Sequence, residues 1–144
     1  MKHKMLTMAL AALAISSFTY AADFNRKEPT TYNYQRGKEA VDEGDTEKAI
    51  EFLSKEVAEN PKSGYGHAWL STMLMNEGEF GRGLTEANLA IKHLPKEDVE
   101  FTSAMYYNRS NVNLNMGDTL AAIKDGNSNG ELVGDTLTTY LVDY

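Results

Sequence analysis

The sequence predicts an all-α fold in which helical hairpins repeat along the chain. A glycine followed by an acidic residue recurs 34 residues apart, at Gly44 and Gly78. A proline recurs at the same interval, at Pro61 and Pro95. Between these markers, apolar residues follow the three- and four-residue spacing of amphipathic helices. Together these observations predict a helix-turn-helix solenoid of about three units.

The chain begins with residues 1–21, which have the composition of a secretory signal peptide. Two lysines come first, an uncharged apolar run follows over 5–18, and Thr19 and Ala21 are the two small residues that the signal peptidase requires. This order is typical of export signals, and the run is shorter than the ~20 apolar residues of a membrane-spanning helix. We expect cleavage after Ala21, with Ala22 as the second choice, and a periplasmic or secreted protein. A retained N-terminal anchor is the alternative.

A linker over 22–29 leads into the first unit, which we place at 30–63. Its first helix carries an apolar stripe and ends at Gly44, because glycine adopts the left-handed conformation that closes many helices. Asp45 or Thr46 then caps the second helix. A proline stops that helix, since proline cannot donate to the backbone hydrogen-bond ladder.

The second unit, 64–97, repeats this scheme, and the third, 103–136, repeats it in part. The third unit has its turn at Gly117 but lacks the closing proline. After it, leucine and tyrosine residues in 137–144 fall at helical spacing. We expect a short C-terminal helix that caps the open end of the solenoid, because stacked repeats expose an apolar face there. The alternative is a fourth unit that was cut short.

The repeated units resemble the tetratricopeptide repeat family, whose unit is a helix-turn-helix of 34 residues. The resemblance covers about residues 30–136. Glu56 and Gly83 depart from the pattern, because the family usually has alanine there. The matching residues are Gly37, Gly44, Asp45, Ala49, Leu53 and Pro61 in the first unit, Leu70, Ser71, Leu74, Gly78, Phe80, Ala87, Ala90 and Pro95 in the second, and Tyr106, Ser110, Gly117, Asp118, Ala122 and Ile123 in the third.

The resemblance implies a function as well as a fold of about three tetratricopeptide-like repeats. Members of the family commonly bind an extended peptide or a partner helix in a concave groove lined by the first helix of each unit. Tyrosine suits such a groove through its contact area, and asparagine through its paired donor and acceptor. The alternative, for each residue assigned to the groove, is that it lies on ordinary solvated surface without a binding role. The positions carried over are Tyr34, Lys38, Asp42, Tyr65, Thr72, Asn76, Tyr107, Asn111 and Asn115.

A second motif lies in the third unit, where residues 125–130 read D-x-N-x-N-G. This is the first half of an EF-hand calcium loop, in which Asp125, Asn127 and Asn129 would supply oxygen ligands. The twelfth position is Thr136 rather than the bidentate glutamate of a complete loop. We therefore expect weak calcium binding at most. The alternative is a second helix that helix-breaking residues turn into a polar loop.

Composition excludes or disfavours several classes of function. The 144 residues include no cysteine and carry a formal net charge of −7. Thiolate chemistry and disulfide frameworks are excluded, and an acidic chain disfavours nucleic-acid binding. His67 and His93 lack metal-ligand spacing, and the sequence has neither a phosphate-binding glycine loop nor a nucleophile elbow.

We therefore expect a non-catalytic scaffold or adaptor without a cofactor, which binds a protein or peptide and does not stay inserted in a membrane after signal cleavage. The alternative is a structural component of a periplasmic or envelope assembly. Such a component would make its contacts through its convex face or its C-terminal helix, where Leu137, Tyr140 and Leu141 form an apolar edge.

Overall fold

The computed structural model describes residues 25–133, and this part of the chain consists of six α-helices without a strand. The predicted all-α class is confirmed over this range. The predicted signal peptide and the C-terminal helix lie outside the described residues. The helices are α2 (Tyr32–Glu43), α3 (Thr46–Glu59), α4 (Gly64–Asn76), α5 (Phe80–His93), α6 (Val99–Asn115) and α7 (Thr119–Val133).

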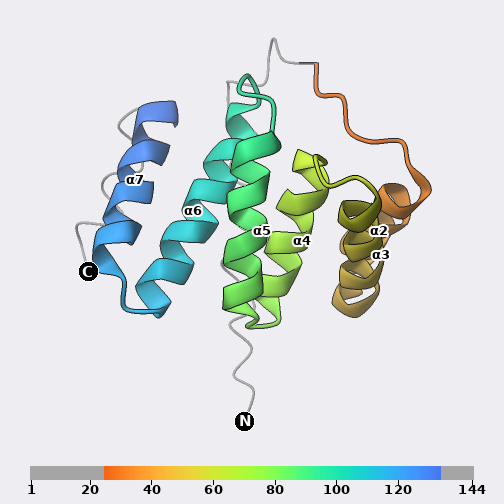
Figure 1. Cartoon of the computed structure of the whole chain (residues 1–144), viewed down its shortest axis with the longest axis horizontal. Helices are drawn as coiled ribbons and strands as arrows, with labels where there is room; N and C mark the ends of the chain where they lie inside the picture. Colours follow the sequence, from red (N-terminus) through yellow and green to blue (C-terminus); the bar gives the residue numbers. More distant parts are fainter. Residues whose placement is uncertain (1–24, 134–144) are drawn as a thin grey trace.

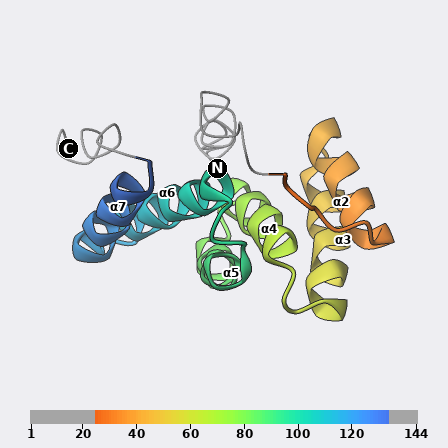
Figure 2. The same cartoon turned by 90° about the horizontal axis from the view of Figure 1, so that it is seen from above.

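The helices pack as three successive hairpins, α2/α3, α4/α5 and α6/α7. Figure 1 shows the hairpins side by side along the long axis of the molecule. The first helices of the hairpins also meet one another, because α4 contacts both α2 and α6. We refer to the surface that these three helices share as the α2–α4–α6 face. In Figure 2, α5 packs beneath α4, on the side away from the segment that precedes α2.

Each hairpin turns at a glycine in the left-handed conformation. The φ angles of Gly44, Gly78 and Gly117 are 74°, 79° and 82°. Side chains with a Cβ rarely adopt this conformation, so the three glycines fix where each first helix ends. The next helix of the first hairpin is capped by Asp45, whose carboxylate accepts a hydrogen bond from the backbone N–H of Lys48 at 3.1 Å.

The contact between the two helices of a hairpin also repeats. Ser71 on α4 donates a hydrogen bond to the carbonyl of Gly83 on α5 at 2.8 Å. Ser110 on α6 donates in the same way to the carbonyl of Ala122 on α7 at 3.0 Å. The corresponding position in the first hairpin is Gly37, where an added Cβ would lie 2.7 Å from a leucine side chain on α3. Small residues therefore set a close approach of the helices in all three hairpins.

Helix α4 forms the centre of the core. All of its residues from Gly64 to Met75 are buried, whereas the other helices bury only part of their length. Leu70 and Leu74 contribute two of the largest fully buried side chains of the described range. The first and third hairpins therefore pack on opposite sides of the middle hairpin, of which α4 is the buried helix. Among residues 25–133, no helix combines the length and apolar character needed to cross a bilayer.

Candidate functional site

The segment 25–31 is not helical and runs along the α2–α4–α6 face before the chain enters α2. Figure 2 shows it in orange, crossing from α4 towards α2. The sequence predicts a linker here, yet side chains of the segment contact the first and the third hairpin. The segment is held at three points, by Arg26, Glu28 and Thr31.

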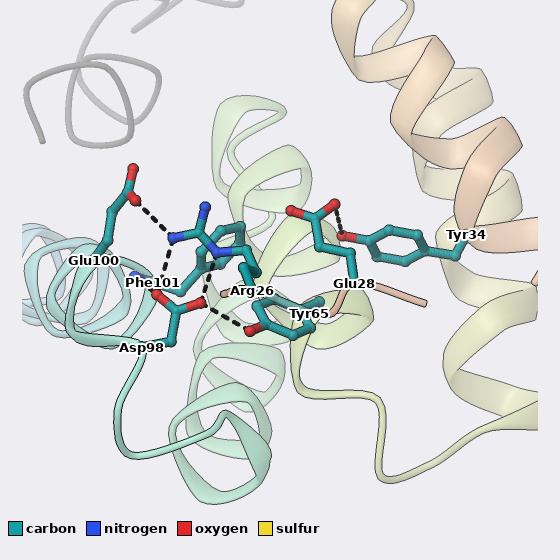
Figure 3. A network of polar contacts seen from close by, with 7 residues as sticks. All are labelled: Arg26, Glu28, Tyr34, Tyr65, Asp98, Glu100 and Phe101. Atoms are coloured by element: carbon teal, nitrogen blue, oxygen red, sulfur yellow. Dashed lines mark hydrogen bonds and ion pairs between the residues drawn. The ribbon is translucent and has the colours of Figure 1, made fainter. Parts of the chain in front are cut away.

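The first point is an ion pair between distant parts of the chain. Arg26 Nε donates to Asp98 Oδ2 at 2.7 Å, and Arg26 Nη2 donates to Asp98 Oδ1 at 3.0 Å. The same Nη2 donates to Glu100 Oε2 at 2.6 Å. The guanidinium carbon also lies 4.6 Å from the centroid of the Phe101 ring. Figure 3 shows the guanidinium between the two carboxylates with the ring beside it. Planar bidentate geometry and stacking on a ring are contacts that arginine makes and lysine does not.

Asp98 is the buried centre of this arrangement, with a side chain only 1% exposed. Tyr65 on α4 donates its hydroxyl to Asp98 Oδ2 at 2.8 Å. The backbone N–H of Phe101 donates to Asp98 Oδ1 at 3.2 Å, so the same carboxylate caps α6. We call the set of Tyr65, Asp98, Glu100 and Phe101 the guanidinium site.

Charge and burial act in opposite directions on the pKa of Asp98. Burial alone would raise the pKa of this carboxyl group, but hydrogen bonds from Arg26, Tyr65 and the Phe101 backbone hold it below its ordinary value. The hydrogen bond to Asp98 raises the pKa of Arg26 in turn. Burial and the bond to Asp98 raise the pKa of Tyr65. At neutral pH the site therefore holds a carboxylate against a guanidinium, with the tyrosine as a neutral donor.

The other two points lie nearer to α2. The Tyr34 hydroxyl donates to Glu28 at 3.0 Å, as drawn in Figure 3. Thr31 Oγ1 donates to Glu56 Oε2 at 2.6 Å. Glu56 is 1% exposed and is one of the residues at which the chain departs from the tetratricopeptide pattern. The departure has a physical reason, because this carboxylate holds the end of the segment against α3.

The structure divides the predicted groove residues into two groups. Tyr34, Tyr65 and Thr72 are buried, at 0%, 5% and 0% exposure, which corrects the expectation that they face solvent. The two tyrosines donate to carboxylates at the segment, as described above. Thr72 lies between α4 and α6, where Asn108 Nδ2 donates to its hydroxyl at 3.2 Å. Helical spacing alone does not separate a groove position from an interhelical contact.

The remaining predicted groove residues reach the surface. Lys38, Asn76, Tyr107 and Asn111 are partly exposed, and Asp42 and Asn115 are exposed. Lys38 Nζ lies 3.9 Å from the centroid of the Trp69 ring, a cation–π contact between α2 and α4. These six residues are available to a ligand on the α2–α4–α6 face.

The structure places the predicted calcium ligands in a helix rather than a loop. α7 runs without a break through 125–130. The carboxylate of Asp125 pairs with the guanidinium of Arg109, whose Nε lies 2.8 Å from Oδ2. Asn113 Nδ2 donates to the same oxygen at 3.2 Å. A helix does not gather alternate side chains around one cation, and among residues 25–133 no cluster of acidic, histidine or cysteine side chains could hold a metal ion.

His67 is a titratable group in the core, with a side chain 4% exposed. Its Nδ1 lies 2.5 Å from a Glu86 carboxylate oxygen and its Nε2 lies 2.6 Å from the Pro61 carbonyl oxygen. Both neighbours are acceptors, so both ring nitrogens donate only when the imidazole is protonated. Burial lowers the pKa of His67, but the hydrogen bonds to Glu86 and Pro61 outweigh it and raise the pKa above its ordinary value.

We expect His67→Gln to reduce stability more at acid than at alkaline pH. A histidine with a raised folded-state pKa stabilises the fold fully below its unfolded pKa, near 6.5, and loses that contribution as pH rises through the folded value. The expected loss is about 1.5–3 kcal/mol at pH ~5.5, with a smaller loss at pH ~8.5. Urea unfolding of both proteins at the two pH values measures it.

His67→Gln needs a control, because His93 stacks on His67 with ring centroids 6.2 Å apart. Burial and nearby cations lower the pKa of His93. Protonation of His93 therefore destabilises the fold, which is the opposite of His67. His93→Gln should raise the free energy of unfolding at acid pH, and this gain should disappear as pH rises. Equal losses of stability for His67→Gln at both pH values would contradict the hydrogen bonds of a protonated His67 to Glu86 and Pro61.

Neither a family model nor a curated protein matches this chain. The function of the α2–α4–α6 face is therefore argued from its own contacts. Sequence analysis missed the residues that anchor the segment, namely Arg26, Glu28 and Asp98. The one local signal is the pair of acidic residues Asp98 and Glu100 at the start of a helix. An acidic residue there can cap the helix, and two together can also bind a cation.

Proposed function

We propose that this protein is a non-catalytic binding module of the tetratricopeptide type, which binds an extended segment of a partner protein on its α2–α4–α6 face. One observation carries the proposal: the face holds an extended segment of the chain itself, 25–31, through side-chain contacts to the first and third hairpins. A surface that orients one extended peptide with side-chain donors and acceptors has the chemistry to orient another.

The repeated features of the hairpins support the tetratricopeptide assignment. The three turn glycines share one conformation, and the serine contact of the second hairpin recurs in the third. Stacked hairpins of this kind build an extended surface whose residues vary while the packing residues stay fixed. The polar residues left exposed on the first helices, Asn76, Tyr107 and Asn111, would contact the ligand directly.

Selection of ligands from a peptide library tests this proposal. We expect selected peptides to bind the full chain, and the triple variant Asn76→Ala, Tyr107→Ala and Asn111→Ala to lose about tenfold or more in affinity. The matched control changes three exposed residues of the second helices, Glu47, Thr85 and Lys92, to alanine. Equal affinity of the two triple variants would contradict the assignment of the face.

We further propose that the protein is exported, with cleavage after Ala21. Support comes from the order of basic, apolar and small residues in 1–21. Cell fractionation followed by N-terminal sequencing of the product tests this step. We expect Ala22 as the first residue, and an intact Met1 in the cytosolic fraction would contradict it.

A second candidate function is a structural part of a larger assembly, which a specific feature favours. The third hairpin exposes large apolar side chains, with Leu120 82%, Met116 59% and Ile123 44% exposed. Apolar surface of this kind is typical of protein contacts. Stable self-association in size-exclusion chromatography that Leu120→Asp abolishes would favour this candidate, and a monomer that binds peptides would favour the first.

A further inference from the structure

The guanidinium site selects for arginine by its construction. Asp98 accepts two parallel N–H groups, Glu100 accepts a third hydrogen bond, and Phe101 offers a ring face 4.6 Å from the guanidinium carbon. A lysine ammonium is a point donor and would satisfy only part of this set. Figure 3 shows that the guanidinium meets the site with its donor edge toward both carboxylates.

The folded hairpins build this site without help from the segment. Asp98 is fixed by the Phe101 backbone N–H and the Tyr65 hydroxyl, at 3.2 Å and 2.8 Å. The Phe101 ring is fixed by edge contacts with Tyr65 and Trp69, with centroids 5.0 Å and 5.8 Å away. If Arg26 leaves, the site keeps its shape and holds a buried carboxylate without its cation. A buried unpaired charge is costly, so the site favours occupation by another guanidinium.

The segment that supplies Arg26 is held loosely in comparison. Among the described residues, no backbone–backbone hydrogen bond joins 25–30 to the helices; the contacts come from side chains. Arg26 itself is 28% exposed in its side chain, whereas Asp98 is 1% exposed. Opening of the segment costs the Arg26–Asp98 ion pair but breaks no backbone hydrogen bond of the hairpins. The segment can therefore leave while the hairpins stay folded.

We propose that the guanidinium site anchors an arginine side chain from an extended segment of a partner protein, which takes the place of Arg26. This inference rests on the proposed function and names the chemistry of its ligand. The chain's own segment then competes with the partner from an intramolecular position. Such competition lowers the apparent affinity for the partner by the fraction of molecules in which the site is open.

Binding of a synthetic peptide with the sequence of residues 25–31 tests the proposal. The fluorescein-labelled peptide is titrated with the full chain and followed by fluorescence anisotropy. We expect the Arg26→Ala protein to bind it about tenfold or more tightly than the wild-type protein does, because the competing side chain is gone. A peptide with alanine in place of the arginine should not bind, and a lysine peptide should bind weakly.

Matched variants separate this effect from general changes in the segment. Lys27→Ala removes the neighbouring cation, which is exposed, and should bind the peptide as the wild type does. Circular dichroism checks that each variant keeps its helices. If Arg26→Ala does not fold, the wild-type protein still gives an answer. Excess arginine peptide should shift the NMR signal of the Arg26 Nε–H towards that of a free side chain, and the alanine peptide should not.

Four results would overturn the proposal. The first is no binding to folded Arg26→Ala protein together with no displacement in the wild type. The second is equal binding of the arginine and alanine peptides. The third is a dimer in which wild-type chains exchange their segments, because the occupant would then be a second copy. Library peptides that bind without arginine would refute this inference and leave the proposed function standing, whereas a library that yields no ligand refutes that function.

Discussion

Arg109→Ala is expected to lower the free energy of unfolding by about 3–5 kcal/mol. Asp125 is 3% exposed, and Arg109 is the cation that pairs with its carboxylate. The pair raises the pKa of Arg109 through the hydrogen bond to Asp125. Removal of the arginine leaves a buried carboxylate whose remaining side-chain donor, among the described residues, is the amide of Asn113. Urea unfolding followed by circular dichroism measures the loss.

An exposed ion pair provides the control for this variant. Arg82 pairs with Glu79 at 2.7 Å, but its side chain is 60% exposed. Surface pairs contribute at most about 1 kcal/mol, so Arg82→Ala should change stability little. The double variant Arg109→Ala with Asp125→Asn should recover part of the loss, because the buried group is then neutral. If Arg109→Ala and Arg82→Ala unfold at the same urea concentration, burial does not set how much the Arg109–Asp125 pair contributes to stability.

Gly64→Ala and Gly81→Ala are expected to change stability in opposite directions, although both replace a helical glycine. At Gly64 an added Cβ would lie 2.6 Å from the Leu94 backbone nitrogen and 2.7 Å from the His93 carbonyl carbon. These are backbone atoms, so the end of α5 must move, at a cost of about 1–3 kcal/mol. At Gly81 nothing lies within 4 Å, and alanine should stabilise the helix by up to about 1 kcal/mol.

Thermal unfolding of the two variants measures this difference. The wild-type protein should unfold between them, with Gly64→Ala at the lowest temperature. The comparison tests the close approach between the start of α4 and the end of α5, within the second hairpin. A Gly64→Ala protein as stable as Gly81→Ala would contradict that approach.

The sequence alone predicted the features that depend on residues close to one another along the chain. Gly44 is a local signal, because a left-handed residue after an apolar stripe ends a helix wherever it occurs. The same pattern located the hairpins, and the 34-residue interval related the first to the second. The all-α class followed from these local rules.

The contacts of the segment 25–31 could not be predicted in this way. Arg26 and Asp98 are separated by 72 residues, and no periodicity relates them. Tyr34 donates to Glu28 of that segment and Tyr65 donates to Asp98, partners that helical spacing does not reveal, so both tyrosines were assigned to an open groove. The prediction of a loop at 125–130 is wrong for a related reason. The motif has low helix propensity, but the structure has an unbroken helix there, in which Asp125 pairs with Arg109 on α6.

The position of Arg26 in solution tests the central claim most directly, namely that the α2–α4–α6 face holds an extended segment through the guanidinium site. NMR of the full chain should show the Arg26 Nε–H in slow exchange with water and its Cδ protons shifted upfield by the Phe101 ring, with Lys27 at ordinary shifts. Arg26 signals that match those of a free arginine side chain and do not respond to Phe101→Leu would contradict the claim.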